Sequence, residues 1–257
     1  MSTTALFARR DGLFVAHEMT RGPWDPQAQH GGAPAALVMR ALEALPAADG
    51  LALARVTYEL LRPVPVAPLE LTASVLRPGR RVQLAEASLT REDGVEVLRA
   101  RALQVQRARA PDTGPGAGLP GLETSRDSDL VAPYRPMFAP DAIEVRFVDG
   151  RFGGGDSTAW FRLRVPVVAG EEPSSLQRLA AAADFGNGIS APMSWDDYVF
   201  INPDLTIYVE REPEGEWIGL QATTRIPPGG VGMAESVLYD ERGRVGRATQ
   251  ALVVGPR

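Results

Sequence analysis

The sequence contains an internal repeat, and this feature constrains the fold more than any other. When residues 57–105 are aligned with residues 206–254, an offset of 149, no gap is needed and fourteen aligned pairs are identical. Thr57 aligns with Thr206 near the start of this block. A register that persists through three predicted turns indicates two copies of one structural unit. Two copies can form a site between them, so the positions at which they differ are the candidates for function.

The composition excludes several classes of function. The chain has 257 residues, a net charge of −5 and no cysteine. The acidic balance disfavours nonspecific binding to nucleic acid, and the lack of cysteine excludes disulfides and thiolate chemistry. Two histidines, His17 and His30, are too few for a three-histidine zinc site. We therefore expect no metal, no cofactor and no nucleic-acid partner.

The N-terminal segment MSTTALFARRDG has neither a long apolar core nor a cleavage pattern, so the sequence predicts no signal peptide. No apolar run approaches the length of a membrane span. We expect a protein that does not span a membrane and resides in the cytoplasm.

Hydrophobic periodicity and turn signals predict the same series of elements in each half. In the first half we expect one strand, one helix and four further strands, at 13–20, 31–45, 52–62, 69–77, 80–91 and 95–107. In the second half we expect two strands, one helix and four further strands, at 143–149, 158–166, 174–185, 203–211, 216–226, 231–240 and 244–254.

The order of these elements predicts an α+β fold in which each half is an antiparallel sheet wrapped around a central helix. This arrangement is the hotdog fold, and the repeat predicts two in tandem, a double hotdog whose two sheets join side by side. Residues 108–133 are rich in Pro, Gly and Ser without periodicity, which is typical of a linker. We therefore assign residues 1–107 to an N-terminal hotdog, 108–133 to the linker and 134–257 to a C-terminal hotdog.

The motif His30-Gly31-Gly32 begins the first predicted helix. A helix N-terminus presents unpaired N–H groups and a partial positive charge. Two glycines remove the side chains there, so a ligand oxygen that gains negative charge can approach the backbone. The alternative is a glycine-rich helix start that packs tightly on the sheet. His30 either caps the helix or contacts a ligand.

Three polar residues of the second half are candidates for catalysis. Asp184 ends the second predicted helix, where a carboxylate opposes the negative end of the helix dipole. Gln250 lies on the inward row of the last strand, where a buried amide needs a partner. The repeat places Arg101 at the matching position of the first half. Asn202 begins a strand, and its amide can hold a water beside Asp184 and Gln250. Each residue also has a structural interpretation. Asp184 is either solvated or paired with Asn187, Gln250 lies near solvent at the end of its strand, and Asn202 forms an Asn-Pro turn.

The segment from Trp24 to Glu43, with the pattern W-D-x-x-x-x-HGG-x-P-A-A-L, resembles the N-terminal hotdog of the acyl-CoA thioesterase II family. The segments AADFGNGIS, FINPDLTIYVE and GRATQALVV resemble its C-terminal hotdog. In that family an Asp, a Thr or Ser, and a Gln activate a water. The resemblance places these roles on Asp184, Asn202 and Gln250, with Asn in place of the hydroxyl residue.

The resemblance implies hydrolysis of an acyl-CoA thioester, with amides at Gly31 and Gly32 stabilising the oxyanion and a homo-oligomeric state. Arg80 and Arg81 are able to meet CoA phosphates, although exposed arginines are ordinarily solvated. The mirrored site lacks His-Gly-Gly and, after Leu42-Glu43-Ala44-Leu45, any obvious Asp, so we expect one site per chain. Two alternatives remain, a noncatalytic acyl-thioester binding protein and an enoyl-CoA hydratase or dehydratase with an Asp/His or Glu/His pair.

Overall fold

The computed structural model describes residues 4–107, 121–130, 132–229 and 231–257. The elements of the first half are β1 (Phe7–Arg10), β2 (Leu13–Ala16), η1 (Glu18–Thr20), α1 (Gly32–Glu43), β3 (Leu51–Leu60), β4 (Pro68–Arg77), β5 (Val82–Arg91) and β6 (Glu96–Gln106). Those that follow are β7 (Arg126–Asp127), η2 (Phe138–Ala142), β8 (Ile143–Asp149), β9 (Ser157–Leu163), α2 (Ser175–Ala183), α3 (Gly186–Ser190), β10 (Tyr198–Ile201), β11 (Asp204–Val209), β12 (Trp217–Arg225), β13 (Val231–Asp240) and β14 (Gly243–Pro256).

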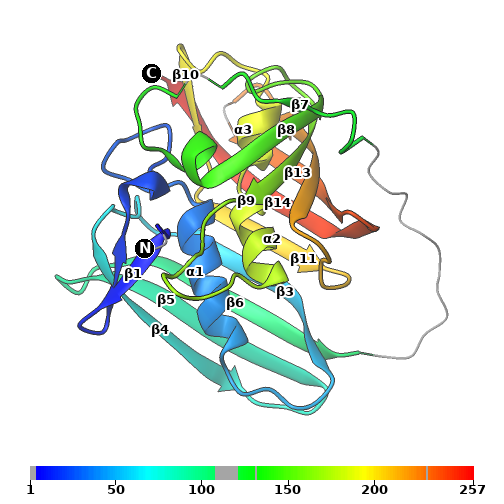
Figure 1. Ribbon diagram of the computed structural model, residues 1–257. Coiled ribbons are helices and arrows are strands. Elements are labelled where there is room, and N and C mark those ends of the chain that lie inside the picture. The colour runs from blue at the N-terminus through cyan, green and yellow to red at the C-terminus, as the bar shows by residue number, and fades with distance from the viewer. Residues whose placement is uncertain (1–3, 108–120, 131, 230) are drawn as a thin grey trace.

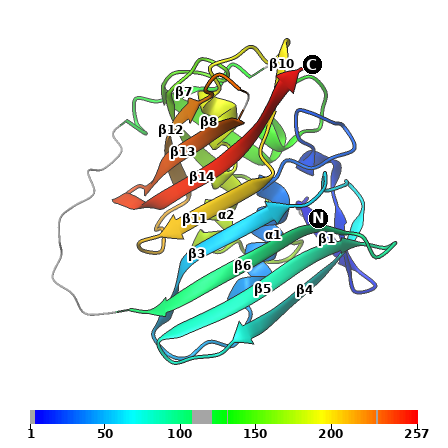
Figure 2. The ribbon, with the colours of Figure 1, turned by 180° about the vertical axis from the view of Figure 1, so that it is seen from behind.

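Within the described residues, the strands belong to one continuous sheet with antiparallel neighbours. Its order is β1-β2-β4-β5-β6-β3-β11-β14-β13-β12-β9-β8-β7, and β10 pairs with β14. Figure 2 shows β14, β11, β3, β6, β5 and β4 in succession across the back of the molecule. The two sheets that were expected to join side by side form one continuous sheet, because β3 and β11 hydrogen-bond to each other and fuse the halves edge to edge. The fusion also covers two strand edges that would otherwise invite aggregation.

The two halves meet at a local two-fold axis that the repeat explains. Thr57 of β3 lies opposite Thr206 of β11, and their side-chain oxygens are 3.1 Å apart. These two residues are partners in the 149-residue repeat, so each half presents the same strand position to the other. The bounds of β5 and β13 also match by this offset, since β5 begins at Val82 and β13 at Val231.

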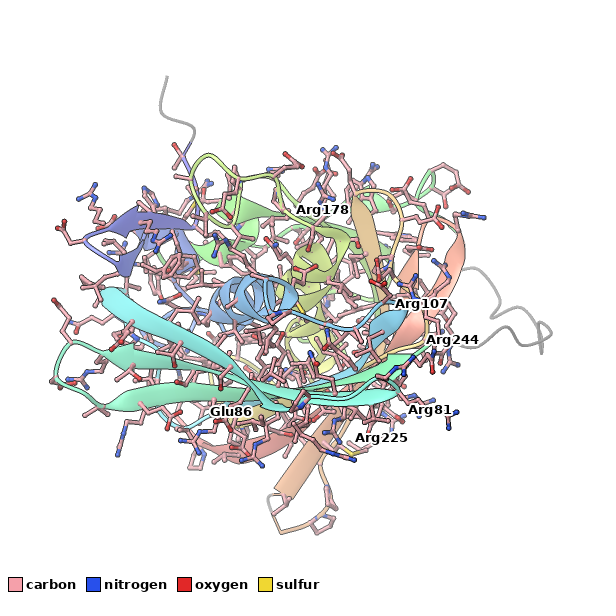
Figure 3. All side chains as sticks on the ribbon, turned by 90° about the horizontal axis from the view of Figure 1, so that it is seen from below. Arg81, Glu86, Arg107, Arg178, Arg225 and Arg244 are labelled. Carbon is pink, nitrogen blue, oxygen red and sulfur yellow. The ribbon has the colours of Figure 1, made fainter. Side chains whose placement is uncertain are left out.

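The helices α1 and α2 lie side by side against the inner face of the sheet (Figures 1 and 3). They run antiparallel, because the end of each lies against the beginning of the other. Their small residues allow a very close approach: a Cβ added to Gly32 would lie 2.4 Å from the backbone oxygen of Ala181. Most of α1 and α2 is buried, which explains the alanine-rich composition of both helices.

The N-terminal helix and most strands lie close to their predicted positions, but several segments differ, and η1, η2 and β10 were not predicted. β1 forms a hairpin with β2 that the sequence reading missed, although its turn at Asp11 and Gly12 has the positive φ angles that such turns require. The second helix stops at Ala183, and a separate short helix, α3, follows it. Of the predicted linker 108–133, residues 108–120 and 131 lie outside the described residues, and Arg126–Asp127 pair with β8.

The repeat loses its register at the last hairpin. Ala85 pairs with Ala102 in the first half, whereas the equivalent Ala234 pairs with Gln250 in the second. The structural counterpart of Gln250 is therefore Ala102, and the alignment with Arg101 is wrong by one residue. The C-terminal hairpin is shorter by one residue, and a one-residue slip turns a side chain to the opposite face of a sheet. Ala102 and Gln250 are both buried, while Arg101 is exposed and pairs with Glu86.

Candidate active site

Asp184 is a buried carboxylate whose position follows from the packing of the two helices. It occupies the C-cap of α2 and is 5% exposed. A carboxylate at this end of a helix opposes the partial negative charge of its own dipole. Because α1 runs antiparallel to α2, the same carboxylate also lies beside the N-terminus of α1, where the partial charge is positive. The unfavourable interaction of Asp184 with the dipole of α2 is thus offset by the dipole of α1, a helix more than 130 residues earlier in the chain.

Two amide side chains hold one oxygen of Asp184. Asn202 Nδ2 donates to Oδ1 at 2.9 Å, and Gln250 Nε2 donates to the same oxygen at 3.1 Å. Gln250 Nε2 also reaches the backbone oxygen of Asp184 at 3.2 Å, and its Oε1 accepts from the N–H of Asn187 at 3.1 Å. These bonds fix the orientation of the Gln250 amide. Asp184, Asn202 and Gln250 therefore converge as the sequence reading expected.

The second oxygen of Asp184 lies against the start of α1. Oδ2 is 3.1 Å from His30 Nδ1. A Cβ added to Gly31 would lie 2.7 Å from Oδ2, closer than ordinary van der Waals contact allows. Gly31 has helical backbone angles, φ −58° and ψ −24°, so its missing side chain serves this close approach and not an unusual backbone conformation.

His30 touches both the helix N-terminus and the carboxylate. Its Nδ1 accepts a hydrogen bond from the N–H of Gly32 at 3.1 Å, and its ring stacks on Phe185 with 4.3 Å between ring centroids. A ring nitrogen of histidine carries either a lone pair or a proton. With the lone pair, Nδ1 accepts from the Gly32 N–H; with the proton, Nδ1 donates to Asp184 instead. In the arrangement with the lone pair on Nδ1, the Gly32 amide is engaged, and among the described residues no acceptor bonds the Gly31 amide.

These groups line a cavity of about 1000 Å³ that lies between the two halves of the chain. Asp184, His30, Gly31 and Asn202 are on its wall, whereas Gln250 and Gly32 lie behind it. The rest of the wall is predominantly apolar and includes Leu61, Val64, Leu130, Met137, Phe152 and Val199. A mostly apolar cavity with a few convergent polar groups is the usual form of a small-molecule site.

The aromatic wall of this cavity was not predicted from the sequence. Trp24 and Trp195 line the cavity and stack with 4.8 Å between ring centroids. The buried Phe200, which is not on the wall, meets both edge to face. Trp24 belongs to the loop before α1, and Trp195 lies beyond α3, so no local pattern relates them. The contact of His30 with Asp184 was missed for the same reason.

A mirrored contact lies at the other end of the helix pair. Glu43, at the end of α1, accepts hydrogen bonds from Ser174 Oγ at 2.7 Å and from Gln177 Nε2 at 3.2 Å at the start of α2. Glu43 is therefore the spatial counterpart of Asp184, which the sequence reading did not recognise. The counterpart of Gln250 in the first half is Ala102 of β6, so no side-chain amide from β6 supports Glu43. Only one end of the helix pair carries the full set of polar groups.

Comparison with known proteins identifies the class. Residues 20–105 match the family model described as the acyl-CoA thioesterase N-terminal domain, and residues 111–254 match the acyl-CoA thioesterase C-terminal domain. The chain belongs to the acyl-CoA thioesterase family, and its enzyme class is thioester hydrolase. The resemblance drawn from the sequence is thereby confirmed.

Solved structures show the fold independently. A hotdog-fold protein of unknown function from Alicyclobacillus acidocaldarius superposes with a TM-score of 0.73 at 18% identity, covering 98% of this chain and 95% of the other. A protein from Thermobifida fusca described as a candidate thioesterase II gives 0.72 at 19% identity, with coverages of 97% and 95%. An acyl-CoA thioesterase II from Mycobacterium marinum gives 0.64 at 14% identity, with coverages of 93% and 96%. A comparison with curated proteins finds no match.

No helix in the described part of the chain is long and apolar enough to cross a membrane.

Proposed function

We propose that this thioesterase hydrolyses acyl-CoA at a single composite site, with Asp184 as the general base, in a chain built of two tandem hotdog units. The observation that carries the proposal is the convergence of a carboxylate from the second half with a helix N-terminus from the first half on one cavity. Neither half contains both groups, so the duplicated fold is required for the chemistry.

The proposed reaction begins with a water beside Asp184 Oδ2. Oδ1 already accepts from Asn202 and Gln250, so Oδ2 is the oxygen that takes the proton as the water attacks the thioester carbonyl carbon. The carbonyl oxygen gains negative charge and is stabilised by the Gly31 N–H at the positive end of α1. The intermediate then collapses, the carbon–sulfur bond breaks, and the proton on Asp184 passes to the CoA sulfur. The products are the free acid and CoA.

Asn202 replaces the hydroxyl residue of the family pattern and still supplies a donor. Its Nδ2 bonds both Asp184 Oδ1 and the backbone oxygen of Asp204, at 2.9 and 3.0 Å. Both amide protons are thus engaged, which leaves the Asn202 side-chain oxygen to accept from the attacking water. This supports a water-positioning role for Asn202, as the sequence reading proposed.

The test is Asp184→Asn, measured by release of CoA thiol from a panel of acyl-CoA substrates. Loss of a general base lowers turnover by about 10²- to 10⁴-fold. The matched control is Asp127→Asn, the same chemical change at an exposed residue outside the cavity. Both variants are compared with the parent by thermal melting. Full turnover in a folded Asp184→Asn protein would end the proposal.

One observation supports a second candidate, hydration of an enoyl-CoA. His30 and Asp184 form the Asp/His contact that this chemistry uses, at 3.1 Å. The same substrate panel includes an unsaturated acyl-CoA: loss of the enoyl absorbance without thiol release identifies a hydratase, and thiol release identifies a thioesterase. Tight acyl-CoA binding with neither change identifies the noncatalytic binding protein. The homo-oligomeric state and the cytoplasmic location stay predictions.

A further inference from the structure

Arg62 and Arg211 occupy equivalent positions in the two halves, and their surroundings differ sharply. They are partners in the 149-residue repeat, and each lies two residues after the equivalent strand, β3 or β11. Both copies keep the arginine, but only one copy neutralises its positive charge with a carboxylate. The arginine of the other copy is therefore a candidate for binding an anionic ligand.

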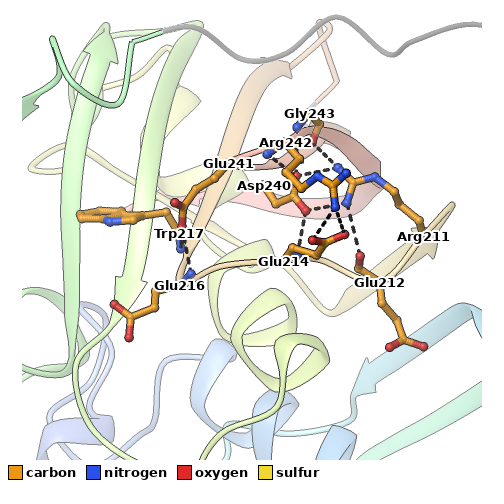
Figure 4. Close-up of polar contacts among 9 residues, drawn as sticks. All are labelled: Arg211, Glu212, Glu214, Glu216, Trp217, Asp240, Glu241, Arg242 and Gly243. Carbon is orange, nitrogen blue, oxygen red and sulfur yellow. Dashed lines mark hydrogen bonds and ion pairs between the residues drawn. The ribbon is translucent and has the colours of Figure 1, made fainter.

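Arg211 forms an ion pair within its own half of the protein. Its two terminal nitrogens bond the two carboxylate oxygens of Asp240, both at 2.6 Å (Figure 4). Arg211 also reaches the backbone oxygen of Gly243 at 3.2 Å, and Asp240 accepts the backbone N–H groups of Glu214, Arg242 and Gly243. The hydrogen bonds that Arg211 donates to Asp240 raise the pKa of Arg211 above its ordinary value. The charge of Arg211 is therefore neutralised within the protein, and its two terminal nitrogens are occupied by protein acceptors.

The first half lacks the carboxylate that pairs with Arg211. Asp240 corresponds to Arg91, a reversal of charge at the position that would otherwise hold Arg62. The three acidic residues that flank Arg211 are also replaced by uncharged ones: Glu210, Glu212 and Glu214 correspond to Leu61, Pro63 and Pro65. Arg91 itself pairs with Asp93 across the adjacent turn. The position that Arg211 takes in its own half is thus repulsive for Arg62.

Arg62 instead lies on the wall of the active-site cavity. It is exposed, and among the described residues no carboxylate forms an ion pair with it. It is also close to the proposed chemistry along the backbone, because Leu60, two residues earlier, donates its N–H to Pro203, the neighbour of Asn202. The wall also carries three aspartates, Asp25, Asp129 and Asp196, and two further arginines, Arg151 and Arg257, so its charge is mixed. An anion at Arg62 is therefore attracted by local pairing and not by a general positive field.

We propose that Arg62 binds a phosphate of the CoA moiety and thereby sets the orientation of the thioester in the cavity. This inference rests on the proposed function and names the residue that recognises the charged end of the substrate. The planar guanidinium presents paired donors that match phosphate oxygens. The predominantly apolar remainder of the wall suits the acyl chain.

The experiment compares Arg62→Gln with the parent on two substrates that carry the same acyl group, acyl-CoA and acyl-pantetheine, which lacks the nucleotide phosphates. We expect the KM for acyl-CoA to rise about tenfold with little change in kcat, since a charged hydrogen bond to an exposed group is lost. The KM for acyl-pantetheine stays the same. The increase shrinks at high salt, because salt screens exposed charges.

The sequence offered Arg81 as a candidate contact for CoA phosphates, but this exposed arginine lies in the β4–β5 turn and is not among the residues that line the cavity (Figure 3). The matched control is therefore Arg81→Gln, which removes the same charge outside the cavity. An equal rise in KM for both substrates, no rise, or the same rise in Arg81→Gln each overturns the proposal. A rise that requires an acyl group with its own carboxylate, such as a dicarboxylic acyl-CoA, assigns Arg62 to the acyl end and also overturns it.

Binding of CoA itself separates this inference from the proposed function. Titration calorimetry with CoA and with pantetheine requires no turnover. Tenfold weaker binding of CoA to Arg62→Gln, with binding of pantetheine unchanged, supports the phosphate contact even if Asp184→Asn retains full activity. Equal CoA affinity in parent and variant overturns the contact even if the protein is an active thioesterase.

Discussion

Replacing Gly31 with alanine is expected to damage catalysis while leaving the fold intact. The backbone of Gly31 is helical, so alanine enters without strain and restricts the unfolded chain, which favours folding by about 0.4–1 kcal/mol. The added Cβ lies 2.7 Å from Asp184 Oδ2 and 3.1 Å from Cγ, whereas ordinary contact begins at 3.4 Å. The carboxylate must therefore retreat by about 0.7 Å, the difference between 3.4 and 2.7 Å.

A displacement of this size matters because the reacting atoms need close alignment. A misplacement of about 1 Å costs roughly a hundredfold in rate, so we expect kcat to fall by about 10- to 100-fold. The assay is thiol release at saturating acyl-CoA together with a thermal melt. The adjacent Gly32→Ala is the informative comparison, since its Cβ meets the backbone oxygen of Ala181 at 2.4 Å.

A backbone atom in a helix cannot move aside as a side chain can. Gly32→Ala is therefore expected to lose about 1–3 kcal/mol of stability through overpacking. The two neighbours should give opposite signatures, an active-site defect at Gly31 and a stability defect at Gly32. A Gly31→Ala protein with parental kcat and an unchanged melting temperature would refute the reasoning, because Asp184 would then tolerate the shift or take no part.

Two further predictions concern the polar contacts. Asn202→Asp replaces a donor 2.9 Å from Asp184 with a second carboxylate, so kcat should fall further than in Asn202→Ala, as steady-state kinetics at neutral pH would show. Burial raises the pKa of Asp240, but hydrogen bonds from Arg211 and backbone amides outweigh it and lower the pKa below 3.8. The ionised Asp240 carboxylate therefore stabilises the folded protein fully at pH values above its unfolded-state pKa of 3.8. This stabilisation is lost as the pH falls through the lower pKa that Asp240 has in the folded state. Asp240→Asn should therefore lose about 3 kcal/mol at pH 7 and much less near pH 2, measured by urea unfolding; an equal loss at both pH values would contradict the assignment.

Much of the architecture follows from local patterns in the sequence. The alternation of apolar residues and the turn residues predicted the strands, and the 149-residue offset predicted that β5 and β13 correspond. These features depend on neighbours within about ten residues, which the sequence displays directly. The inward position of Gln250 followed from alternation within one strand in the same way.

The errors arose where the structure depends on pairing between distant segments. Alternation fixes the face on which a residue lies within a strand, but the length of the hairpin sets which partner it meets. Gln250 was therefore placed correctly on its strand and matched with the wrong residue, Arg101, in place of Ala102. The sequence predicted that the two sheets join side by side, but not that β3 and β11 are the strands that meet, because hydrogen bonds between strand edges carry no side-chain signature.

The sequence by itself determined the duplicated framework and the chemical types available at Asp184, Asn202 and Gln250, because both are written in local composition and periodicity. The tertiary structure alone decided that α1 and α2 run antiparallel in close contact. That packing places the carboxylate of one half beside His30 and Gly31 of the other, and it offsets an unfavourable helix-end charge with the opposite end of a second dipole. Contacts of this kind are set by the shape and packing of whole elements, which no short segment of the chain encodes.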